Sequence, residues 1–274
     1  MGADRQRAAA MLHTDLAYAF LVARATADAS FHIGAARRII GMMKAGGRGD
    51  DRTQLFERRW FVVTAGWYTA VGRLQQAELF VRDGLSEYPR DAMLHVARGC
   101  IREMDAALMV TDARNGAQVS RATRLLEAAA ADYRRALAYD DTLASAHLHL
   151  GWVRFLGRDD RSIPEFESAL EHADDDTTRY LARLFLGAVA ERQNRLEDAR
   201  REYEAAFALG SSYQTAFIAL SRAEEALGHS ARARELAQQY AALGEKHEDP
   251  WWDYHLGGFD QATLQWLRRE ARSQ

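Results

Sequence analysis

An internal period of 34 residues constrains the fold of this chain more than any other feature of its sequence. The repeated positions carry small or aromatic side chains, and they pair as Gly187 with Ser221, Ala199 with Ala233, Tyr203 with Ala237, and Ala206 with Tyr240. A period of this length is typical of arrays in which each repeat is one pair of helices. A single pair cannot bury enough apolar surface alone, so neighbouring pairs must stack. The period therefore predicts a helical array that presents a surface.

Three further copies of the pattern precede these two. The first of them carries small and large side chains in the same order: Phe61, Ala65, Tyr68, Gly72, Ala77, Val81 and Pro89. Two irregular copies follow, one beginning at Ala92 and the other at Ala144. The copy that begins at Ala144 is one residue shorter between Gly151 and Ala169 than the regular spacing requires.

The copy that begins at Ala92 contains an insertion. Its equivalent small residues, Gly99 and Ala136, lie 37 residues apart, whereas the regular pair Gly187 and Ala206 lies 19 apart. The 18 extra residues are expected near residues 105–122, where they lengthen the first helix and add a loop. The turn signal Asn115-Gly116 places that loop around residues 112–119, with the second helix expected from Thr123 to Tyr139.

These copies resemble the tetratricopeptide repeat, a helix–turn–helix unit with the pattern W-x-x-L-G-x-x-Y followed by Ala, Phe and Pro. The resemblance covers roughly residues 58–245 and five units, two of them irregular. It implies an all-α fold, a right-handed superhelical solenoid of antiparallel helix pairs. The residues agree with it, because Ala, Leu, Arg and Glu dominate and no run of alternating β-branched residues predicts a sheet.

The repeat array, residues 51–246, has a helical segment on each side. Residues 1–50 predict two helices, about 4–28 and 30–45, which form a divergent repeat or a cap. Residues 247–274 predict capping helices, a short one from Pro250 behind the N-cap Asp249 and a longer one over 260–271. The aromatic residues of this end favour a cap on the last repeat over a docking patch.

Motifs that carry chemistry are missing from the sequence. The nine histidines are scattered, and His147 and His149 point to different faces of a helix, so they are poor metal co-ligands. The segment 46–51 is rich in glycine but lacks the ending of a phosphate-binding loop. No nucleophile, base and orienting group converge. We therefore expect no catalytic, cofactor-binding or metal-binding residue, and we expect the chain not to be an enzyme.

Charge, cysteine content and hydropathy restrict the class of partner and the cellular compartment that we expect. The 36 basic and 39 acidic residues give a net charge of −3, which argues against nucleic acid as the main partner. The single cysteine, Cys100, allows no internal disulfide. No apolar run reaches the roughly 18 residues that span a bilayer, and the first residues do not predict a signal peptide. The sequence thus indicates a cytoplasmic protein, or a periplasmic one if a signal has been removed.

In this repeat family the first helices of successive units line a concave groove that takes a peptide or a partner helix. By that resemblance the partner-binding residues are Val62, Val96, Cys100, Leu148, Trp152, Phe155, Leu184, Glu191, Ile218 and Arg222. The alternative is that about half of them pack between helices. Trp152 is the expected aromatic anchor, since such anchors dominate binding near the centre of an interface. A clamp of Lys and Asn for a terminal carboxylate is disfavoured, because the chain has only two residues of each type and none at groove positions.

The leading hypothesis is a non-enzymatic scaffold or adaptor for protein–protein interaction. A peripheral subunit of a larger assembly is one form that such a protein takes. It binds a peptide or a partner helix in the groove. The alternative is a regulatory protein that senses a ligand or a peptide. It would need an output domain, and residues 1–50 are too short and weakly patterned for a helix-turn-helix. An enzyme with chemistry hidden in the groove is a third, disfavoured reading.

Overall fold

The structure, a computed structural model, describes residues 3–22, 25–45, 51–111, 116–242 and 249–255. Within these ranges every regular element is a helix, which confirms the predicted all-α class. The chain divides by compactness after Asp140 into unit 1, described by α1–α6, and unit 2, described by α7–α13. The division into residues 1–50, 51–246 and 247–274 follows the repeat pattern instead and stays a prediction.

Unit 1 contains three helix pairs in which each helix packs against the next along the chain. The first helix ends at Val22, earlier than the sequence predicts, because a new helix begins at Thr26 with Asp28 in its first turn, where acidic side chains are favoured. The second and third pairs are the first two repeats. The helices are α1 (Ala3–Val22), α2 (Thr26–Ala45), α3 (Asp51–Ala70), α4 (Leu74–Glu87), α5 (Ala92–Thr111) and α6 (Gly116–Tyr139).

The insertion lengthens both helices of its pair. The first helix, α5, continues to Thr111, and α6 begins at Gly116 rather than at Thr123. The expectation of a loop over 112–119 is therefore wrong for residues 116–119, while residues 112–115 lie outside the described residues. Residues 116–119 are helical rather than a loop because the two long helices, α5 and α6, pack against each other.

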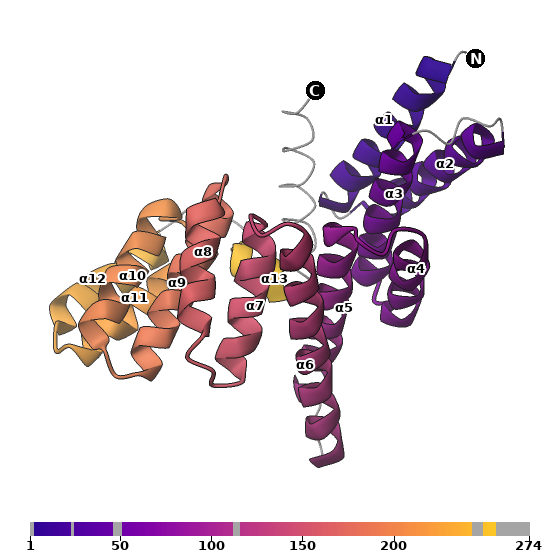
Figure 1. Ribbon diagram of the computed structural model, residues 1–274. Coiled ribbons are helices and arrows are strands. Elements are labelled where there is room, and N and C mark those ends of the chain that lie inside the picture. The colour runs from indigo at the N-terminus through magenta and orange to yellow at the C-terminus, as the bar shows by residue number, and fades with distance from the viewer. Residues whose placement is uncertain (1–2, 23–24, 46–50, 112–115, 243–248, 256–274) are drawn as a thin grey trace. The chain divides into compact units, whose positions relative to one another are not determined.

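Unit 2 contains the three remaining repeats as stacked pairs, α7 with α8, α9 with α10 and α11 with α12 (Figure 1). The first helices of neighbouring pairs also contact each other, α7 with α9 and α9 with α11. A short helix, α13, contacts α9. The helices are α7 (Ala144–Leu156), α8 (Ser162–His172), α9 (Asp176–Arg192), α10 (Leu196–Leu209), α11 (Gln214–Ala226), α12 (Ser230–Ala242) and α13 (Pro250–His255).

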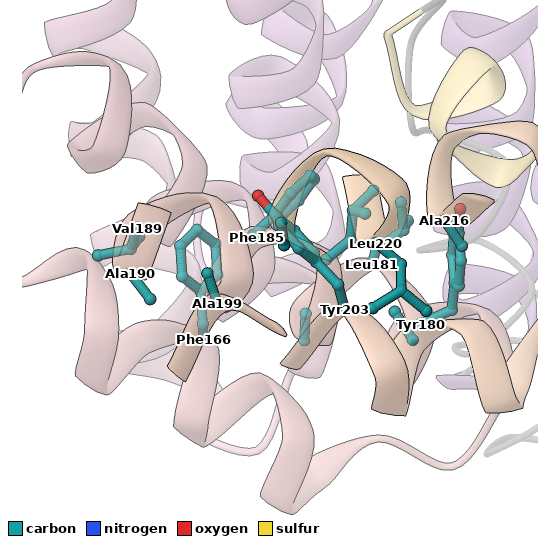
Figure 2. Close-up of a cluster of buried hydrophobic side chains, with 14 of the residues drawn as sticks. Phe166, Tyr180, Leu181, Phe185, Val189, Ala190, Ala199, Tyr203, Ala216 and Leu220 are labelled. Atoms are coloured by element: carbon teal, nitrogen blue, oxygen red, sulfur yellow. The ribbon is translucent and has the colours of Figure 1, made fainter. Parts of the chain in front are cut away.

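Aromatic rings and small residues build the core of unit 2. Figure 2 shows Phe185, Leu181 and Tyr180 of α9 among the rings and small side chains of the neighbouring helices. In the pairs α7–α8 and α9–α10, a glycine on the first helix lets an aromatic ring of the second helix approach. A Cβ built at Gly187 would lie 2.3 Å from the Tyr203 ring. The small-then-large order of the sequence repeat is therefore the packing rule within these pairs.

Four of the turns between the two helices of a pair contain a residue in the left-handed conformation. Gly72 and Gly228 occupy this conformation in two of the turns, with φ of 74° and 84°. Arg158 and Asn194 occupy it in two others, with φ of 57° and 58°. Asparagine tolerates this region and glycine prefers it, whereas arginine is strained there.

Candidate functional site

The candidate site is the surface that α7, α9 and α11 contribute in unit 2, which we call the first-helix face. It is defined by Leu148, His149, Trp152, Tyr180, Leu184, Phe185, Thr215, Ile218 and Arg222. The chain's own segment Asp249–Tyr254 lies against this face through hydrogen bonds and ring contacts. The predicted short C-terminal helix is thus present, and the surface that it covers is built from first helices.

Asp249 anchors the segment at its beginning, with only 2% of its surface exposed. The backbone N–H of Thr215 donates to its Oδ2 at 2.6 Å, and the hydroxyl of Tyr180 donates to its Oδ1 at 3.2 Å. The N–H of Trp251 donates to Oδ1 at 2.9 Å, which confirms Asp249 as the N-cap of α13. The carboxylate therefore lies at the N-terminal ends of two helices at once, where the helix dipoles favour negative charge.

The α11 N-terminus depends on this carboxylate. Its own N-cap residue, Tyr213, makes no capping hydrogen bond through its side chain, so Asp249 satisfies an α11 N–H from 34 residues away. Burial and the nearby Asp249 carboxylate raise the pKa of Tyr180, which keeps its hydroxyl protonated as a donor. A carboxylate at this point is thus matched by two donors of the first-helix face.

Two aromatic side chains of α13 form the second anchor. Trp251 and Tyr254 stack on each other with a centroid distance of 6.1 Å and an interplanar angle of 3°. Both meet Trp152 and Phe185 edge to face, with Trp251 at 5.0 Å from Trp152 and Tyr254 at 5.2 Å from Phe185. Tyr254 also stacks on the buried His149 at 4.7 Å. Such aromatic contacts contribute about 0.5–1.5 kcal/mol each beyond the area that they bury.

The predicted partner-binding residues fall into three groups by exposure. Most are buried against neighbouring helices: Val62, Val96, Cys100, Leu148, Trp152 and Leu184. Phe155 and Glu191 are partly buried, whereas Ile218, at 48%, and Arg222 are exposed. Trp152 is 8% exposed and lies beneath the rings of α13. Val62, Val96 and Cys100 belong to unit 1 and the other seven residues to unit 2, and the set as a whole stays a prediction.

Two of the predicted residues form a salt bridge with each other. Arg222 on α11 donates to Glu191 on α9 at 2.6 Å, so the two charges are neutralised between neighbouring repeats. The hydroxyl of Tyr203 donates to the other oxygen of Glu191 at 2.7 Å. Arg192 lies over the ring of Phe155 at 3.9 Å, a cation–π contact. These charges are partnered on the protein itself.

Unit 1 has polar features of its own. The fully buried Asp132 accepts hydrogen bonds from Arg98 and Arg102, the closest on each at 2.6 Å, which ties α5 to α6. A cavity of about 350 Å³ lies among α2, α3 and α4, with Trp60 and Lys44 in its lining. The Lys44 ammonium is paired with carboxylates there, so the charges lining the cavity largely cancel.

Neither a metal site nor a membrane span is found in the described part of the chain. No cluster of three or more His, Cys, Asp or Glu side chains there is arranged to hold a metal ion. None of the helices that the structure describes combines the length and the hydropathy that crossing a bilayer requires.

Sequence reasoning missed the carboxylate and the rings that occupy the face. Asp249 was expected only as a helix cap, and Trp251 and Tyr254 only as apolar surface at the end of the array. His149 and Phe185 lie next to Leu148 and Leu184 in the predicted groove register, so that register could have indicated them. The contacts of Asp249 had no signal in the sequence, because its partners are 34 and 69 residues away.

Comparison with known proteins identifies the fold. No protein-family model matches the chain. No curated protein matches its sequence. Solved structures that resemble it include PilF of Pseudomonas aeruginosa, 17% identical with a TM-score of 0.57 over 71% of this chain and 79% of that chain. PilW, a type IV pilus biogenesis factor, is 21% identical with a TM-score of 0.56 over 77% and 91%. A monomeric IFIT1 mutant solved with Gppp-AAAA is 15% identical with a TM-score of 0.54 over 79% and 58%.

At these identities the likeness establishes the fold alone. The neighbours are proteins of tetratricopeptide repeats, and the chain has the same kind of fold, built from stacked antiparallel helix pairs. The predicted solenoid of helix pairs is thereby confirmed.

Proposed function

We propose that this chain is a non-enzymatic scaffold or adaptor that binds a peptide or a helical segment of a partner protein on the first-helix face. The observation that carries the proposal is that this face already holds a short helical segment through side-chain anchors and one helix N-terminus. It thus has the features of a surface that recognises a peptide. Structural neighbours such as PilW, described as a pilus biogenesis factor, favour a role in an assembly.

The partner is proposed to be a protein rather than a nucleic acid. The net charge of −3 gives no excess of basic residues, and the exposed Arg222 of the face is paired with Glu191. Recognition of phosphates needs a concentrated basic surface. The first-helix face offers aromatic rings and hydrogen-bond donors instead.

A matched pair of surface substitutions tests the proposal. Ile218→Glu places a charge on the first-helix face, and Leu79→Glu places one on α4, where the side chain is equally exposed, at 47% against 48%. Neither should unfold the protein. A partner that co-purifies with the wild-type chain under native conditions should be lost with Ile218→Glu and retained with Leu79→Glu. Equal retention, or equal loss, would contradict a role for this face.

The cavity in unit 1 supports the second candidate function, a ligand-sensing regulator. Its aromatic wall and paired charges fit a small molecule with apolar and polar parts. A ligand of that class should raise the melting temperature of the wild-type chain, and substitution of Trp60 should abolish the shift. If no compound of that class raises the melting temperature, the ligand-sensing function is refuted and the scaffold function remains.

A further inference from the structure

We propose that Asp249–Tyr254 is a resident and displaceable ligand of the first-helix face. The partner that replaces it then presents the same chemistry, a carboxylate followed two and five residues later by aromatic side chains on one side of a short helix. This inference rests on the proposed function and specifies its ligand. The occupant is a segment of a partner protein.

The contacts of the segment are those of a bound peptide. A six-residue helix is unstable alone in water, so α13 owes its helical form to the surface beneath it. Its anchors are spaced along the chain, with Asp249 at the α11 N-terminus and Trp251 and Tyr254 on α7 and α9. Three neighbouring first helices therefore share one short segment. This is how a repeat surface reads a linear motif.

The chemistry of each anchor sets what can replace it. A segment without the carboxylate leaves the Thr215 N–H and the Tyr180 hydroxyl without their acceptor in a buried place, which is costly. A segment without the aromatic pair leaves Trp152 and Phe185 uncovered. A segment that binds this face therefore needs an acidic residue and two aromatic rings. A basic or purely aliphatic segment should not bind it.

The covalent connection makes the segment a competitor. Asp249 follows the end of α12 by seven residues, so the segment acts on the face at a high effective concentration, of millimolar order for a short connection. A partner binds only to the fraction of molecules whose face is open. Its apparent affinity is therefore weakened by the resident segment, and it rises when that segment is removed from the face.

Binding of a synthetic peptide to the full chain tests this directly. The probe is a fluorescein-labelled peptide with the sequence of residues 247–256, measured by fluorescence anisotropy. The wild-type chain should bind it weakly, and the opened variant Asp249→Ala/Trp251→Ala/Tyr254→Ala should bind it at least about tenfold more tightly. Phe31→Ala, which removes an exposed ring in unit 1, should behave as the wild type does.

Two control peptides test the chemistry. A peptide with Asn in place of Asp249 should bind the opened variant about tenfold more weakly, since hydrogen bonds to a charged acceptor are stronger. A scrambled peptide should not bind. Equal affinity of the wild-type and opened chains, or no binding by an opened chain that keeps its helical circular dichroism, would overturn the inference.

If the opened variant fails to fold, a chain that can be cleaved after folding provides the test instead. A protease site placed within residues 243–248 allows the connection to be cut after folding. The labelled peptide should then displace the released fragment, and it should do so poorly before cutting. No displacement at saturating peptide would show that the segment is a permanent part of unit 2.

Two outcomes separate this inference from the function that it rests on. In the first outcome, Ile218→Glu loses the native partner but the labelled peptide never binds. The scaffold function would then stand, and the proposal that Asp249–Tyr254 is a displaceable ligand would be refuted. A wild-type chain that light scattering shows to be a dimer, and an opened variant that is a monomer, would also refute it. That result would mean the segment is exchanged between two copies of the chain.

Discussion

Substitution of Gly187 by alanine should destabilise the protein, although alanine is the better helix former. The new Cβ would lie 2.3 Å and 2.4 Å from two ring carbons of Tyr203, far inside normal contact distance. Tyr203 cannot turn away, because it is 2% exposed and its hydroxyl is held by Glu191 at 2.7 Å. Helices α9 and α10 must therefore separate.

The expected magnitude is a difference between two effects. Alanine gains about 1 kcal/mol over glycine in a helix interior. Overpacking a filled core costs about 1–3 kcal/mol, and here the clash falls at the upper end because both partners are fixed. We expect a net loss of about 2 kcal/mol in the free energy of unfolding, measured by urea titration with circular dichroism. Gly41→Ala on α2, where the new Cβ has no atom within 4 Å apart from the adjacent backbone of its own helix, should instead be neutral or stabilising.

A double mutant decides whether the clash is the cause. The α3–α4 pair carries Ala65 and Val81 at the positions that Gly187 and Tyr203 occupy in α9–α10. Gly187→Ala combined with Tyr203→Val should therefore lose at least about 1 kcal/mol less than the sum of the two single losses. Additive losses, or a Gly187→Ala variant as stable as Gly41→Ala, would refute the reasoning.

Three further predictions concern charge and backbone strain. Asp132→Ala should lower the free energy of unfolding by about 3 kcal/mol, because it leaves two largely buried guanidinium groups without their shared partner; a loss below about 1 kcal/mol in urea titration would contradict this. Burial alone would lower the pKa of His147, but hydrogen bonds with Glu165 and the Asp141 carbonyl raise it above 6.5. The stability that the pair contributes is thus fully present below pH 6.5 and is lost as the pH rises through the raised pKa, so the gap between wild type and His147→Gln should shrink from pH 6 to pH 9. Arg158→Gly should raise the free energy of unfolding by about 0.5–1 kcal/mol, because the φ of 57° suits glycine, and the melting temperature should rise with it. No rise in the melting temperature would show that the turn is not strained.

The candidate site was only partly accessible from the sequence. The repeat register placed Leu148, Trp152 and Leu184 on first helices, and the structure places them there. Their burial was not readable, because it depends on what covers each helix after stacking. Trp152 was expected as an aromatic anchor for a partner, with packing between helices as the alternative, and the chain's own α13 covers it.

The sequence by itself determined the helix pairs of this protein and the rule by which they pack. Small residues such as Gly187 recur at fixed distances from the residues that pack on them, and this information is local, within about 20 residues along the chain. The extent of each helix in the inserted pair was not local, since the long helices α5 and α6 stabilise each other only once they are packed. Only the tertiary structure could bring Asp249 to Thr215 and Tyr180, because stacking of the pairs creates the first-helix face, and a segment outside the repeat pattern occupies it.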